Sequence, residues 1–132
     1  MKKVLVAGAT GYLGKHIVNE LKSRGYWVRV LIRKESQKKL FKDVDDFFVG
    51  EITMPKTLVS IAENIDWVFS TIGITRQKED LTYMDVDYQG NVNFLYEAKK
   101  SGVEKFEYIS AMPTWKVRYD RKNPSAQNYL LL

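Results

Sequence analysis

The sequence predicts an α/β fold in which helices cover a parallel β-sheet. Two observations support this: short apolar runs alternate with segments of helical periodicity, and glycine or proline residues mark many of the boundaries between them. Strands that alternate with helices in this way are typical of βαβ units, whose strands run parallel. The length of 132 residues is that of one domain with its own core.

The first half of the chain contains three expected strands and two expected helices. Residues 3–8 form an apolar run that ends in glycine, and residues 12–24 follow with apolar side chains every fourth position and a glycine as stop signal. Residues 27–32 are rich in β-branched side chains, which favours a second strand. A short helix at 35–41 and a third strand at 46–49 complete this half.

The second half continues the alternation up to about residue 111. Pro55 suits the first turn of a helix that is expected to run to about residue 63. A fourth strand is expected at 66–71, a long helix at 82–101 and a fifth strand at 105–110. Residues 112–132 show no clear period, so we predict a domain that spans residues 1–111 and an irregular tail that follows it.

The composition excludes several classes of function. Without cysteine the chain has no disulfides, thiol nucleophiles or thiolate metal sites, and its single histidine argues against a His-based zinc site or a Ser-His-Asp triad. The acidic cluster at residues 43–46 is interpreted as a solvated loop, and no metal site is predicted. No apolar run is long enough to span a membrane, and we expect a cytoplasmic protein. The net charge of +5 lies largely in residues 111–132 without a recognition-helix pattern, which argues against nucleic acid as a partner.

A glycine-rich loop with the spacing GxxGxxG lies between the first strand and the first helix. Gly8 allows a tight turn, Gly11 lets the backbone approach a pyrophosphate, and Gly14 lets the helix pack closely on the strand. Free N–H groups at the start of a helix attract phosphates. A P-loop is excluded, because Ala9 and His16 replace the glycine and the hydroxyl residue that it requires. The predicted cofactor-binding residues of the loop are Gly8, Thr10, Gly11, Tyr12, Leu13 and Gly14.

The residues at the end of the second strand indicate which dinucleotide binds. An acidic residue about 20 positions after the glycines favours NAD, because it accepts a hydrogen bond from the ribose 2′-hydroxyl, whereas an arginine accommodates the 2′-phosphate of NADP. Arg33 lies 19 residues after Gly14, and Lys34 follows it. These two cations favour NADP over NAD. Glu35 keeps the alternative open, since it would supply the NAD-type acid if the strand ran further.

Together these motifs resemble the atypical short-chain dehydrogenase/reductase superfamily, in its NmrA-like, NAD(P)-binding branch. The resemblance covers residues 1 to about 111 and also rests on residues 50–52, 70–73, 86–91 and 108–110. It implies a Rossmann-like, three-layer, doubly wound parallel sheet of five strands in the order 3-2-1-4-5. It places the adenine near Glu51 and Ile52, where the family usually has Asp at the first position. The residues that it adds to the cofactor site, the last three of them toward the nicotinamide, are Ile52, Thr71, Ile72, Gly73 and Ser110.

The same resemblance raises the question of a catalytic residue. Short-chain dehydrogenases commonly use a Tyr-x-x-x-Lys pair for acid/base chemistry, and the chain has one match, Tyr96 and Lys100. We interpret this match as coincidental, because Tyr96 is expected about 15 Å or more from the sheet edge where ligands bind. Ser110 ends a strand at that edge but has no Tyr-Lys pair after it. No catalytic residue is therefore predicted.

Two functions are consistent with this pattern. The first is an NADP(H)-binding domain of an NmrA-like reductase with incomplete catalytic machinery, since relatives are longer and carry a substrate-binding part after the fifth strand. The second is a non-catalytic NADP(H) sensor or assembly factor that acts through a protein partner. The fifth strand would expose an unpaired edge, which we expect either to be covered by residues 111–132 or to drive self-association.

Overall fold

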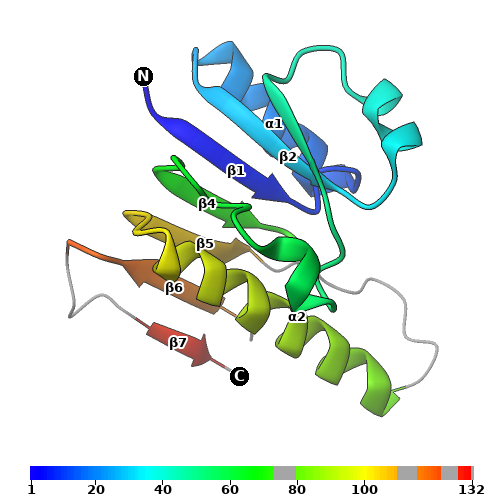
Figure 1. The fold of residues 1–132 in the computed structure, drawn as a ribbon, viewed down its shortest axis with the longest axis vertical. Helices are drawn as coiled ribbons and strands as arrows, with labels where there is room; N and C mark the ends of the chain where they lie inside the picture. The colour runs from blue at the N-terminus through cyan, green and yellow to red at the C-terminus, as the bar shows by residue number, and fades with distance from the viewer. Residues whose placement is uncertain (73–79, 110–115, 123–127, 132) are drawn as a thin grey trace.

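The computed structural model describes residues 1–72, 80–109, 116–122 and 128–131. Their strands form one seven-stranded sheet in the order β3-β2-β1-β4-β5-β6-β7 (Figure 1). The first five strands pair in parallel, which confirms the predicted order 3-2-1-4-5. The strands are β1 (Lys3–Ala7), β2 (Trp27–Ile32), β3 (Asp46–Val49), β4 (Trp67–Ser70), β5 (Lys105–Ile109), β6 (Lys116–Asp120) and β7 (Asn128–Leu131).

Two α-helices and two short 3₁₀ helices connect these strands: α1 (Tyr12–Ser23), η1 (Glu35–Leu40), η2 (Pro55–Leu58) and α2 (Asp80–Lys100). The helix expected from Pro55 to about residue 63 is therefore only one turn long. Ser60 and Asn64 follow it with φ of 70° and 64°, a left-handed conformation that a right-handed helix does not contain. Within the described part of the chain, no helix combines the length and the apolar content that crossing a membrane requires.

The two faces of the sheet are covered by different helices. Successive side chains of a strand point to opposite faces, so Leu5 of β1 is buried in the core that α2 covers. Val4 and Val6 are buried in the core that α1 covers. Phe94 of α2 and Val18 of α1 fill these two cores. Because one helix lies on each face, the architecture has the three layers that the sequence predicts (Figure 1).

The structure differs from the irregular tail that was predicted for residues 112–132. Residues 116–120 form β6, which pairs antiparallel with the whole of β5, and residues 128–131 form β7 beside it. The edge of β5 that was expected to be open is therefore covered, as the first of the two expected outcomes requires. Val117 and Tyr119 alternate with charged residues, which is a strand pattern, but the run is too short to stand out next to the prolines at 113 and 124.

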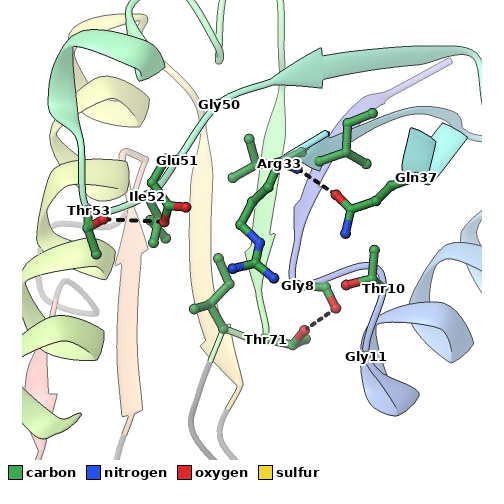
Figure 2. A pocket seen from close by; sticks show the side chains of 13 residues that line it. Gly8, Thr10, Gly11, Arg33, Gln37, Gly50, Glu51, Ile52, Thr53 and Thr71 are labelled. Atoms are coloured by element: carbon green, nitrogen blue, oxygen red, sulfur yellow. Dashed lines mark hydrogen bonds between the residues drawn. The ribbon is translucent and has the colours of Figure 1, made fainter. Parts of the chain in front are cut away.

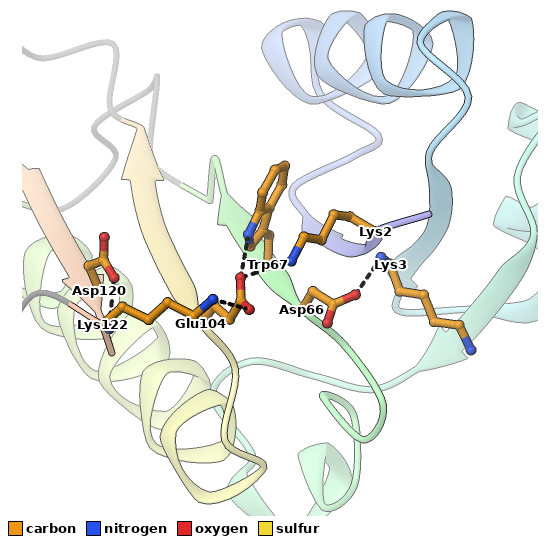
Figure 3. Close-up of polar contacts among 7 residues, drawn as sticks. All are labelled: Lys2, Lys3, Asp66, Trp67, Glu104, Asp120 and Lys122. Carbon is orange, nitrogen blue, oxygen red and sulfur yellow. Dashed lines mark hydrogen bonds and ion pairs between the residues drawn. The ribbon is translucent and has the colours of Figure 1, made fainter.

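The amino-terminal edge of the sheet carries an ion-pair cluster centred on the half-buried Glu104 (Figure 3). Its carboxylate accepts from Lys122 Nζ at 3.0 Å, from Lys2 Nζ at 3.1 Å and from Trp67 Nε1 at 3.3 Å. These donors, of which Lys122 has the largest effect, lower the pKa of Glu104 to about 2. The cluster connects the start of β1, the start of β4 and the chain just after β6, so it fixes strands that are far apart in the sequence.

Candidate functional site

A pocket with a volume of about 360 Å³ opens at the carboxyl ends of β1, β2 and β4 (Figure 2). In open parallel sheets, ligands bind at this edge, at the point where the strand order reverses. In this sheet that point lies between β1 and β4. The volume lies in the range of ligand pockets. The residues that line it are Gly8, Thr10, Gly11, Leu31, Ile32, Arg33, Gln37, Gly50, Glu51, Ile52, Thr53, Thr71 and Ile72.

Two glycines of the loop after β1 occupy positions that exclude a side chain. Gly8 has φ +80°, and a Cβ there would lie 2.9 Å from the carbonyl carbon of Thr71. A Cβ on Gly14 would lie 2.6 Å from the carbonyl carbon of Gly8, so α1 packs on the loop at a distance that only glycine allows. A Cβ on Gly11 would meet only the carbonyl oxygen of Gly8, at 3.5 Å. Gly11 is thus open toward the pocket, and the loop fits the close approach of a phosphate.

The start of α1 presents unused hydrogen-bond donors beside this loop. The N-cap of α1 is Gly11, which has no side chain to accept from the first turn, and that turn contains no acidic residue. The first backbone bond of the helix is from Lys15 N–H to the carbonyl of Gly11, at 2.9 Å. Among the described residues, the N–H groups of Tyr12, Leu13 and Gly14 find no acceptor. Such a terminus, with its partial positive charge, is suited to an anion.

The end of β2 places one of the two predicted cations in the pocket. The side chain of Arg33 extends into it (Figure 2), and no ion-pair partner for its guanidinium is found among the described residues. Lys34 is exposed and lies outside the lining. Glu35, the alternative acid, also lies outside and pairs with Lys38 Nζ at 2.7 Å. This end of the pocket is therefore cationic.

Sequence reasoning missed Gln37 of η1, which lines the pocket next to Arg33. Its amide oxygen accepts from the backbone N–H of Arg33 at 2.7 Å and from that of Lys34 at 3.1 Å. The signal that could have found it is its position: in a helix that starts at Glu35, Gln37 is the third residue, whose side chain accepts from the N-cap N–H of Lys34 in a capping box. The other lining residues that were not predicted as cofactor-binding are Leu31, Ile32, Gly50, Glu51 and Thr53.

Helix α2 fixes two of the loops that form the pocket. Asn93 Nδ2 donates to the carbonyl of Ile52 at 3.0 Å, and Asn91 Nδ2 donates to the carbonyl of Ile72 at 3.1 Å. Asn91 Oδ1 also accepts from the fully buried hydroxyl of Ser70, at 2.6 Å. The loops after β3 and β4 are thus held by side chains two positions apart on one helix.

The remaining predicted site residues lie in other places. Tyr12 and Leu13 have exposed side chains that do not line the pocket, so only their backbone is available to it. Gly14 is buried beneath the loop. Gly73 and Ser110 lie outside the described residues.

Tyr96 of the Tyr-x-x-x-Lys match is exposed to 65% on α2, as expected for a surface aromatic. Its position along the helix differs from the one on which the predicted distance was based. α2 begins at Asp80 and reaches the level of that edge at Asn91. Tyr96 therefore lies about 7–8 Å further along the helix axis. What separates it from the pocket is the face of the helix on which it lies.

Comparison with known proteins agrees with this geometry. A family described as NAD(P)H-binding matches residues 8–130 of the chain. The chain belongs to this family. The match includes β6 and most of β7, so these strands are within the part that the family shares.

Relatives of the family are longer than this chain. The chain is 34% identical over 111 residues to the photosystem II assembly factor Ycf39 of Synechocystis, which covers 83% of this chain and 34% of that protein. It is 28% identical over 117 residues to a 3β-hydroxysteroid dehydrogenase/Δ5→4-isomerase of Mycobacterium tuberculosis, covering 83% and 31%. Among solved structures, the UDP-glucose 4-epimerase of Thermus thermophilus in complex with NAD superposes with a TM-score of 0.67 at 26% identity, covering 79% of this chain and 36% of that one.

The chain thus spans about a third of the length of the relatives it matches. It is an NAD(P)-binding domain similar to short-chain dehydrogenases/reductases, and the resemblance predicted from its motifs is confirmed.

Proposed function

We propose that the chain binds NADP(H), with the pyrophosphate at the glycine loop and the 2′-phosphate at Arg33. The observation that supports this preference is the position of Arg33 in the pocket without a described ion-pair partner, while Glu35 is paired with Lys38 outside it. A dianionic phosphate gains charge-assisted hydrogen bonds from a guanidinium, which is planar and always charged. Lys34 contributes to the local positive potential from outside the lining.

Each part of the pocket then has a role in binding. The N–H groups at the start of α1, with Thr10, bind the pyrophosphate, and the backbone at Ile52 contacts the adenine. The residues that continue toward the nicotinamide are Thr71, Ile72, Gly73 and Ser110. When bound, the nicotinamide supplies or accepts a hydride. The protein orients the cofactor, because α2 fixes the loops at both Ile52 and Ile72.

Two uses of the bound cofactor follow from this proposal. The first is reduction of a small substrate by a longer protein of which this chain is the cofactor-binding part, as in reductases of the family. The second is a non-catalytic role, in which the NADP(H)-bound chain acts through a protein partner. Two observations favour the non-catalytic role for this chain. Tyr96 is exposed on α2 and does not line the pocket, and the chain is similar to Ycf39, which is named as an assembly factor.

Calorimetric titration with NADPH and NADH tests the cofactor preference. Hydrogen bonds to a charged group contribute about 1.5–3 kcal/mol, so we expect NADPH to bind about 10- to 100-fold more tightly. Arg33→Ala should remove most of this preference. Lys39→Ala is the control, because it removes an exposed charge from η1 outside the pocket lining. Equal affinity for both cofactors, or a preference that Arg33→Ala leaves intact, contradicts the proposal.

A further inference from the structure

The side-chain amide of Gln37 has a fixed orientation. Two backbone N–H groups, those of Arg33 and Lys34, point at the same atom of this amide, at 2.7 Å and 3.1 Å. An N–H group can donate only to the amide oxygen, since the amide nitrogen carries hydrogens and has no acceptor capacity. The oxygen therefore faces the end of β2, and the nitrogen must face away from it.

The direction away from β2 is toward the glycine loop. Figure 2 shows the Gln37 nitrogen on the side where Thr10 lies, and both residues line the pocket. No acceptor for this nitrogen is found among the described residues. Gln37 thus presents two N–H donors in the same part of the pocket that Arg33 reaches from β2. Both residues offer only donors there, because the acceptor atom of Gln37 is already used.

We infer that Gln37 is a specificity-determining residue, which donates a hydrogen bond to the 2′-phosphate of NADP(H) next to Arg33; this rests on the proposed function. A phosphate only accepts at neutral or alkaline pH, so a donor-only surface suits it. A ribose 2′-hydroxyl gains most from a carboxylate that accepts a hydrogen bond from it, as in NAD-binding sites. An amide and a carboxylate have the same shape, which allows a direct test of this difference.

Gln37→Glu is the informative substitution. One carboxylate oxygen keeps accepting from the N–H groups of Arg33 and Lys34, so the turn after β2 is retained. The second oxygen replaces the NH₂ group and repels a phosphate. Ser36→Glu is the matched control, because it adds the same charge to η1 at an exposed neighbour that does not line the pocket.

The probes are adenosine 2′,5′-bisphosphate and 5′-AMP, which differ only in the 2′-phosphate, titrated by calorimetry. We expect Gln37→Glu to weaken binding of the bisphosphate about 10- to 100-fold and not to weaken binding of 5′-AMP, whose 2′-hydroxyl can donate to the new carboxylate. Ser36→Glu should change both by less than about threefold. Gln37→Met, which removes the donors without adding a charge, should weaken the bisphosphate about tenfold, and it keeps the inference testable if Gln37→Glu does not fold.

Failure of this inference differs from failure of the proposed function. If the unsubstituted chain prefers the bisphosphate and Arg33→Ala abolishes the preference, NADP(H) binding stands. Bisphosphate affinity that is then unchanged in folded Gln37→Glu or Gln37→Met overturns the role of Gln37 alone. Equal loss in Ser36→Glu also overturns it, because general repulsion would then account for the effect.

Discussion

The glycine loop allows stability and binding to be separated by two substitutions of the same size. Gly14→Ala places a Cβ 2.6 Å from the carbonyl carbon of Gly8 and 2.7 Å from the Cα of Ala9. Both are backbone atoms, which cannot rotate away, so α1 must shift from β1. Overpacking costs about 1–3 kcal/mol, and contacts this short with backbone atoms place Gly14→Ala in the upper part of that range, above the gain of roughly 1 kcal/mol in helix propensity. Gly11→Ala meets only an oxygen at 3.5 Å, so it causes no overpacking, and its effect on the fold is limited to the poorer N-cap propensity of alanine, about 0.5 kcal/mol.

Thermal unfolding and NADPH titration of both variants check this prediction. We expect Gly14→Ala to lower Tm by several degrees, since about 1 kcal/mol corresponds to roughly 4 °C in a chain of this size. Gly11→Ala should unfold within about 2 °C of the unsubstituted chain but bind NADPH at least tenfold more weakly, because its methyl group occupies the side open to the phosphate. A Gly14→Ala chain that unfolds like the original, or a Gly11→Ala chain that binds like it, refutes the reasoning.

Three further predictions concern other parts of the molecule. Glu104 should stabilise the fold above its unfolded pKa of about 4.5, and this contribution should be lost as the pH falls toward about 2. Glu104→Gln should therefore flatten the dependence of Tm on pH between these two values. An unchanged dependence would contradict the role of the cluster. Asn91→Ala leaves the buried hydroxyl of Ser70 without its acceptor, so urea unfolding should show a loss of about 1–3 kcal/mol, whereas a loss near zero would mean that α2 does not fix the loop. Tyr96→Phe should leave any NADPH oxidation with quinones or aldehydes unchanged, since its side chain is exposed; activity that disappears in this variant would identify Tyr96 as the acid.

The five parallel strands were predictable because their signals are local. The run at β2, Trp-Val-Arg-Val-Leu-Ile, is delimited by residue type alone, and its predicted bounds are those of the structure. η2 was predicted too long because Pro55 indicates only where a helix starts. The ψ of 129° at Val59 and the positive φ of Ser60, which end it, depend on the surroundings. β6 follows β5 after residues 110–115 and pairs with it, but its five residues alternate over too short a run to be delimited by residue type alone.

The candidate site also contains residues that the sequence predicts and residues that it does not. The glycines act through the backbone of a single loop, so their spacing is sufficient to predict the close contacts of Gly8 and Gly14. Gln37 and Asn93 act on backbone groups of other elements, at the end of β2 and after β3. The position of Gln37 in the first turn of η1 indicates only its contact with the N–H of Lys34. Nothing in the identity or spacing of Asn93 indicates the carbonyl of Ile52. The polar residues that shape the pocket from outside the motif therefore became visible only in the fold.

The distribution of charge connects the fold to the proposed function. At the amino-terminal edge, charged groups neutralise one another: Glu104 binds Lys2 and Lys122, and Asp46, expected in a solvated loop, binds Arg29 at 2.7 Å. At the carboxyl edge, Arg33 is left without a described partner. An ion pair at Arg33 would have to be broken before a phosphate could bind, and its absence removes that cost. Substitutions at Glu104 should therefore change the stability of the fold and leave cofactor affinity unchanged. Arg33→Ala should lower cofactor affinity and leave stability unchanged. A variant of either residue that changed both quantities would show that the two edges are coupled through the sheet.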